Sequence, residues 1–152
     1  MPNARARITP KLIDSLYTEA MVLADEARAY FDRQGREERL ELDPLVRVGF
    51  SCESLKVTTR LMHIIAWLLT QKAVEAGELT PSQARAPQRR LGEAAESDPE
   101  LMTMLPPAAL HLVQASRDLF ARVQRLDQGG GGAIEPQPSP ARTLMNRLES
   151  SF

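Results

Sequence analysis

The stretch that decides the fold runs from Arg60 to Ala73 and reads "RLMHIIAWLLTQKA". It is the least polar part of the chain and holds its single tryptophan, Trp67, and one of its two histidines, His63. Only 11 uncharged residues separate Arg60 from Lys72, whereas about 20 are needed to cross the hydrocarbon core of a membrane. The stretch therefore predicts the middle of a helix in a bundle and no membrane span.

This stretch belongs to one long predicted helix. Asp43 followed by Pro44 has the pattern of a helix cap and first helical residue, and no proline or glycine cluster interrupts the sequence before Gly77. The central helix is thus expected over about residues 44–76, and its length is roughly 50 Å at 1.5 Å per residue.

Two further helices flank the central one in the sequence. Apolar residues at spacings of three and four predict helices over 10–32 and 107–126. Residues 32–42 are expected to form a polar turn, and 78–106 a long, irregular connection with one or two short helical turns. No alternating strand pattern of useful length is present, so we predict an all-α fold, a three-helix bundle with a long central helix, for residues 1–128.

Polar and apolar residues divide the central helix into two faces. A broad apolar arc is expected to pack on both other helices: Leu55, Leu61, Met62, Ile65, Ala66, Leu68, Leu69 and Ala73. The remaining strip is polar, yet it contains the tryptophan, a residue type enriched at interface hot spots. We therefore predict a partner-binding surface formed by Arg60, His63, Ile64 and Trp67. The alternative is that the connection 78–106 folds over Trp67 and buries it inside the monomer.

Residues 129–152 have the composition of a tail. Four consecutive glycines are followed by a proline-rich segment, which predicts a flexible, disordered spacer. The last dozen residues differ, because they carry apolar side chains at helix-like spacing. These residues predict a short docking peptide that binds a partner: Leu144, Met145, Leu148 and Phe152.

Charge and cysteine content restrict the partners and the compartment. The net charge is −1, from 19 basic and 20 acidic residues, so there is no broad attraction to nucleic acid or to an anionic membrane surface. A single cysteine, Cys52, allows no internal disulfide. The N-terminal segment lacks the apolar core of a signal peptide. We expect a cytoplasmic protein whose partners are other proteins.

Candidate catalytic groups are few and poorly placed. Cys52 and His63 are eleven residues apart, about 16 Å along one helix, so they do not form a thiol–imidazole dyad there. Cys52 is expected to be a small packing residue at the edge of the apolar arc. His63 and His111 form no metal-ligand pair, and the glycine run lacks the lysine of a phosphate-binding loop. We expect no catalytic, cofactor or metal site.

The segment Phe50–Glu78, "FSCESLKVTTRLMHIIAWLLTQKAVEAGE", resembles a signature of the alphaproteobacterial regulator of CtrA degradation (RcdA) family. The matching residues are Ser54, Leu55, Thr59, Arg60, Leu61, Met62, Trp67, Leu68, Leu69, Gln71 and Ala73. The resemblance implies a three-helix bundle that forms homodimers and acts as an adaptor delivering substrates to the ClpXP protease. It also implies a response-regulator-like co-adaptor, a cyclic-di-GMP-binding partner and a role in the cell cycle.

The sequence thus favours a non-enzymatic adaptor in regulated proteolysis that binds cargo proteins and the unfoldase machinery. A second hypothesis is a helical scaffold or regulatory dimer unconnected to proteolysis. A third, less favoured, is a small enzyme that uses Cys52 or His63.

Overall fold

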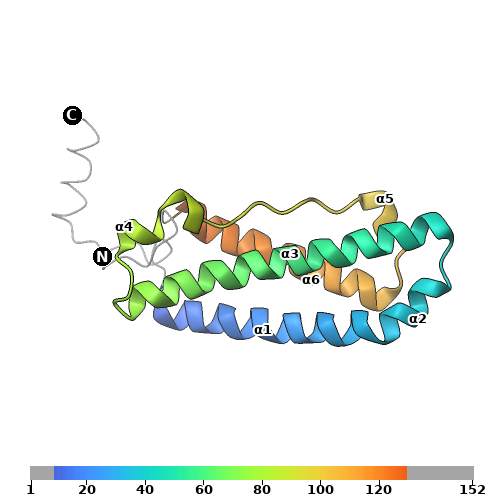
Figure 1. Ribbon diagram of the computed structural model, residues 1–152, viewed down its shortest axis with the longest axis horizontal. Helices are drawn as coiled ribbons and strands as arrows, with labels where there is room; N and C mark the ends of the chain where they lie inside the picture. Colours follow the sequence, from blue (N-terminus) through green and yellow to red (C-terminus); the bar gives the residue numbers. More distant parts are fainter. Residues whose placement is uncertain (1–8, 130–152) are drawn as a thin grey trace.

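Three long helices form a bundle in the computed structural model, which describes residues 9–129 (Figure 1). They are α1 (Pro10–Asp32), α3 (Pro44–Glu75) and α6 (Pro107–Gly129). Each begins with proline, whose fixed φ and missing N–H suit the first helical position. The described part is all-α, as predicted, and α3 packs against both other helices. None of the described helices is long and apolar enough to cross a membrane.

Four short elements connect the long helices: α2 (Gln34–Leu40), α4 (Pro81–Ala84), η2 (Pro87–Arg89) and α5 (Pro99–Met102). The sequence predicted the short turn after Asp98, but it was wrong about α2, where a polar turn was expected. Gly35 explains the difference, because it is buried against Tyr30 and brings the chain close enough for a second helix. The Tyr30 hydroxyl then donates a hydrogen bond of 2.5 Å to Glu38 on α2.

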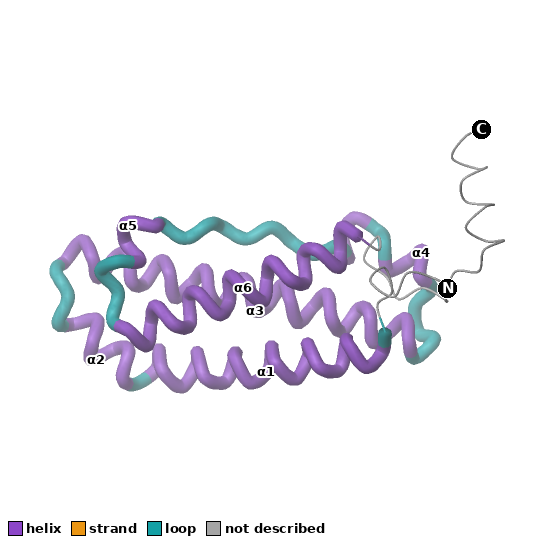
Figure 2. The backbone as a smooth tube through the Cα atoms, turned by 180° about the vertical axis from the view of Figure 1, so that it is seen from behind, coloured by secondary structure: helices purple, strands orange, loops and turns teal. Residues whose placement is uncertain are grey.

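The helix α6 runs parallel to α3, not antiparallel to it. The chain returns along the bundle through an extended segment, residues 91–98, which we call the strap (Figures 1 and 2). Within the described residues, the strap makes no backbone–backbone hydrogen bonds between Leu91 and Ser97. Side chains of α3 must therefore hold it.

Candidate protein-binding surface

The four helix residues predicted to bind a partner lie mostly inside the monomer. The exposed fractions of Arg60, Ile64 and Trp67 are 2%, 0% and 1%, while His63 is half-buried. The expected exposed strip is thus wrong for these three side chains. The other four predicted partner residues, Leu144, Met145, Leu148 and Phe152, lie outside the described residues, so their role stays a prediction.

Trp67 is enclosed by α6 and by the connection after α3. Its Nε1 donates to Oδ1 of Asp127 at 3.0 Å. Arg90, in the connection 78–106, donates to the same carboxylate from Nε at 2.7 Å and from a terminal nitrogen at 3.1 Å. The alternative stated for Trp67 is therefore the correct one: the indole is buried within the monomer and its N–H is satisfied there.

A buried polar network joins α3 to the strap. Arg60 donates to Ser97 at 2.8 Å, to the carbonyl of Ala95 at 3.0 Å and, on α6, to Ser116 at 3.1 Å. Burial lowers the pKa of the Arg60 guanidinium. Such a buried charge needs several hydrogen-bond acceptors, and here the strap supplies two of the three.

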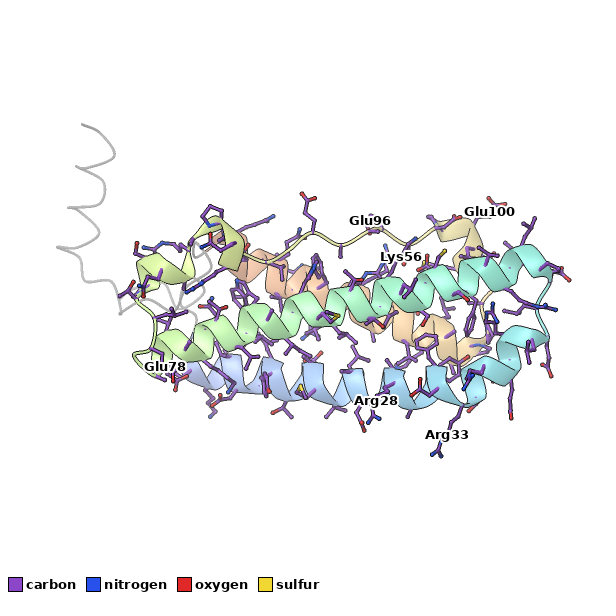
Figure 3. The ribbon with its side chains drawn as sticks, viewed as in Figure 1. Arg28, Arg33, Lys56, Glu78, Glu96 and Glu100 are labelled. Carbon is purple, nitrogen blue, oxygen red and sulfur yellow. The ribbon has the colours of Figure 1, made fainter. Side chains whose placement is uncertain are left out.

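Glu53 completes this network about two turns earlier on α3. Its carboxylate accepts from Ser97 of the strap and from Lys56 at 2.9 Å. Figure 3 shows Lys56 on the side of α3 that faces the strap, on which Glu96 is labelled. Burial alone would raise the pKa of Glu53, but these hydrogen bonds outweigh it and hold the pKa below the ordinary value of 4.5.

These contacts explain why the predicted faces of α3 were wrong. Hydropathy assigns arginine, glutamate and glutamine to the solvent, yet Glu53, Arg60 and Gln71 are buried, and the first two are hydrogen-bonded to the strap. A buried position accepts a polar side chain whose hydrogen bonds are satisfied. Sequence periodicity does not reveal the strap, so it could not reveal this.

The helix consequently turns apolar side chains outward. Leu55, Met62 and Leu69, all placed in the packed arc by the sequence, have exposed fractions of 67%, 64% and 47%. Cys52 was expected to pack in the interior and is exposed instead. The expectation for these four residues is corrected: only Leu61 and Leu68 of the named leucines are in the core.

The exposed positions follow a seven-residue repeat along α3. We call this surface the α3 outer face; its members are Leu45, Val48, Cys52, Leu55, Thr59, Met62, Ala66 and Leu69, all exposed. They alternate at spacings of three and four, the pattern of a coiled-coil seam. This spacing was present in the sequence and could have identified the surface, but on a helical wheel these positions adjoin Leu61 and Leu68, so the exposed and buried groups merge into one broad apolar arc.

A groove between α1 and α3 widens this apolar surface. A cavity of about 320 Å³ is lined by Ala24 and Phe31 of α1 and by Met62 and Ile65 of α3. A second cavity, of about 370 Å³, also touches Phe31 and is bordered by basic side chains of α2. We call the two together the α1–α3 groove. Its dimensions suit large apolar side chains of another polypeptide segment.

The described residues show no arrangement typical of catalysis. His111 lies on the exposed face of α6, 3.8 Å from Glu26. His63 contacts the strap, and its Nδ1 has no hydrogen-bond partner within residues 9–129. In this part of the chain, no group of three histidine, cysteine, aspartate or glutamate side chains could hold a metal ion.

The fold and this surface define the class: an all-α helical bundle with an uncovered apolar helix face. The chain belongs to the family described as "Protein of unknown function (DUF1465)", whose family model matches residues 4–152. RcdA from Caulobacter crescentus CB15, known from a crystal structure, is similar to the chain with 34% sequence identity and a TM-score of 0.65. The match covers 82% of this chain and 93% of RcdA. No curated protein matches the chain.

The predicted resemblance to the RcdA family is therefore confirmed by the matched structure. At 34% identity over nearly all of RcdA, the similarity extends well beyond the segment Phe50–Glu78 on which the prediction rested.

Proposed function

We propose that this protein is a non-enzymatic, cytoplasmic adaptor in regulated proteolysis, which binds cargo proteins and delivers them to the ClpXP protease to control the cell cycle. The observation that carries the proposal is the similarity to RcdA, at 34% identity over 93% of that chain. The exposed apolar surface supports it, because contiguous apolar patches on soluble proteins mark interaction sites.

We further propose that the adaptor is a homodimer in which the α3 outer face of one copy packs against that of the other. The seven-residue repeat from Leu45 to Leu69 supports this occupant, because coiled-coil seams pair with seams of the same period. A two-fold interface also places the same patch on both copies. Leu55 and Met62 would lie near its centre.

The terminal peptide, with Leu144, Met145, Leu148 and Phe152, is proposed to contact partner proteins. Linking such a peptide to a bundle that binds a second site raises the local concentration of the partner, so weak contacts suffice. The division into a bundle, residues 1–128, and a tail, residues 129–152, is part of this proposal.

Reconstituted degradation tests the adaptor role. Purified ClpXP would be incubated with CtrA, the protein in the family's name, with and without the full chain and the response-regulator-like co-adaptor. The expected result is a shorter CtrA half-life when the chain is present. Equal half-lives under all conditions would contradict the adaptor role for this cargo.

A double variant, Leu55→Glu with Met62→Glu, tests whether the α3 outer face forms the dimer. Both side chains are exposed in the monomer, so the free energy of unfolding of the monomer should change by no more than about 0.5 kcal/mol. The variant should sediment as a monomer where the unmodified chain sediments as a dimer. If the chain dimerises but leaves degradation unchanged, the scaffold hypothesis is favoured instead.

A further inference from the structure

The α1–α3 groove is an apolar surface that another polypeptide segment could cover. Met62 and Ile65 of α3 line it together with Ala24 and Phe31 of α1, and Met62 is exposed. Covering such exposed apolar surface with another segment is favourable, because each Å² of apolar area removed from water contributes about 25 cal/mol of free energy. The chain itself contains a segment of matching chemistry.

We propose that the terminal peptide of the same chain, residues 141–152, occupies this groove. Written as a helix at 100° per residue, its four large apolar side chains fall within an arc of about 100°; they are Leu144, Met145, Leu148 and Phe152. Arg142 and Asn146 lie on the opposite side. One helix face of this kind is what a groove between two helices accepts.

The end of α6 is close enough for the peptide to reach the groove. Asp127 contacts Trp67, so α6 ends beside the last turns of α3, as Figure 1 also shows. Ala141 follows Gly129 by 12 positions, and a linker of that length spans roughly 20 Å. This exceeds the helix diameter of about 10 Å that separates the two sides of α3. The peptide would enter near Ile65.

Length and charge favour one direction for the peptide. Twelve helical residues extend about 18 Å, close to the roughly 21 Å between Ile65 and Ser51 along α3. A peptide that enters at Ile65 brings Phe152 to the second cavity, beside Phe31 and Leu55.

The basic side chains of α2 support the same direction. Arg36 and Arg39 line the second cavity, and neither forms an ion pair within residues 9–129. Glu149, one turn before Phe152, would lie opposite these two arginines.

A peptide in the groove would regulate dimerisation through the α3 outer face. This consequence rests on the proposed function. Met62 and Leu55 belong both to the groove and to the α3 outer face. The terminal peptide therefore competes with a second copy for the same side chains. Occupancy of the groove by the peptide does not itself depend on the dimer or on proteolysis.

Intrachain disulfide trapping in the full chain tests this occupancy. Cys52 is the single cysteine, is exposed, and lies one turn before Leu55 at the end of the groove where the peptide should finish. The test variant is Ser151→Cys and the matched control is Arg142→Cys, at the entrance near Ile65. Copper–phenanthroline would be the oxidant, and intrachain and interchain products would be separated on non-reducing gels at several protein concentrations.

The expected result is that Ser151→Cys links to Cys52 within one chain at least about tenfold faster than Arg142→Cys, because a docked peptide raises the local thiol concentration. Adding Met62→Glu, whose folding is checked by its unfolding curve, should remove this difference. Equal rates for the two cysteine variants, or an unchanged difference with Met62→Glu, would overturn the proposal. Interchain products in excess of those of the unmodified chain, in which only Cys52 can cross-link, would overturn it too, since the peptide would then bind another copy. The assay contains no protease or cargo, so it is independent of the adaptor test.

Discussion

Single polar residues hold the strap to the bundle, and Glu53 is the one whose effect depends on pH. Its pKa in the folded state lies below the ordinary value of 4.5 because of hydrogen bonds from Ser97 and Lys56. A depressed folded-state pKa stabilises the fold above the unfolded-state pKa, and this stabilisation is lost as the pH falls through the folded-state value. The free energy of unfolding should therefore fall on acidification below about pH 4.5.

Glu53→Gln should lower the free energy of unfolding by about 1–3 kcal/mol at neutral pH and flatten its decline between about pH 5 and pH 3. Denaturant titrations over this range, with Glu75→Gln as an exposed control on the same helix, would measure both effects. An equally steep decline in Glu53→Gln and the unmodified chain would show that another group causes it.

The sequence was least able to predict which single side chains are buried. It identified Arg60, His63 and Trp67 as unusual residues on a polar strip, which they are. It could not show that the strip is internal, because the hydrogen-bond partners of Arg60 and Trp67 include Ala95, Ser97 and Asp127. These lie between 35 and 60 residues away in the chain, and no local pattern specifies such contacts.

The bounds of the long helices were predicted far better than the buried and exposed faces of these helices. The bounds of α1, α3 and α6 agree with the expected ranges within three residues, because caps and prolines are local signals. The helix α2 was missed, since its formation depends on the approach of Gly35 to α1. The parallel course of α6 depends on the extended strap, which has no periodicity of its own.

Gly35 provides a prediction at the scale of the α1–α2 corner. A methyl group at this position would lie 2.9 Å from the carbonyl oxygen of Tyr30 and 3.0 Å from its ring. Although alanine favours helices over glycine by about 1 kcal/mol, this overlap with backbone should reverse the sign. Gly35→Ala is expected to destabilise the protein by about 1–3 kcal/mol.

Gly129→Ala is the matched control, because no atom of the described residues, apart from its neighbours in the chain and its own helix backbone, lies within 4 Å of the added methyl group. It should be neutral or slightly stabilising. Chemical denaturation monitored by helical circular dichroism would compare the two variants. If Gly35→Ala were as stable as Gly129→Ala, the close packing of α2 on α1 would not be the reason for the glycine.

In the whole molecule, dimerisation and docking of the terminal peptide use one surface. A change in the affinity of one must therefore alter the affinity of the other. If the terminal peptide covers the groove nine-tenths of the time, each copy is available for pairing only one-tenth of the time. The apparent dissociation constant of the dimer is then weakened about 100-fold, because two copies must both be open.

Leu148→Asp should release the peptide and strengthen the dimer by up to about this factor, since an aspartate does not stay in an apolar groove. Asn146→Asp adds the same charge on the opposite side of the peptide and should leave the dissociation constant unchanged. Sedimentation equilibrium of the two full-length variants would measure the difference. A dimer equally strong in both would mean that the peptide does not compete for Met62 and Leu55. The absence of any dimer would instead contradict the pairing of α3 outer faces, while disulfide trapping would still report whether the peptide lies in the groove.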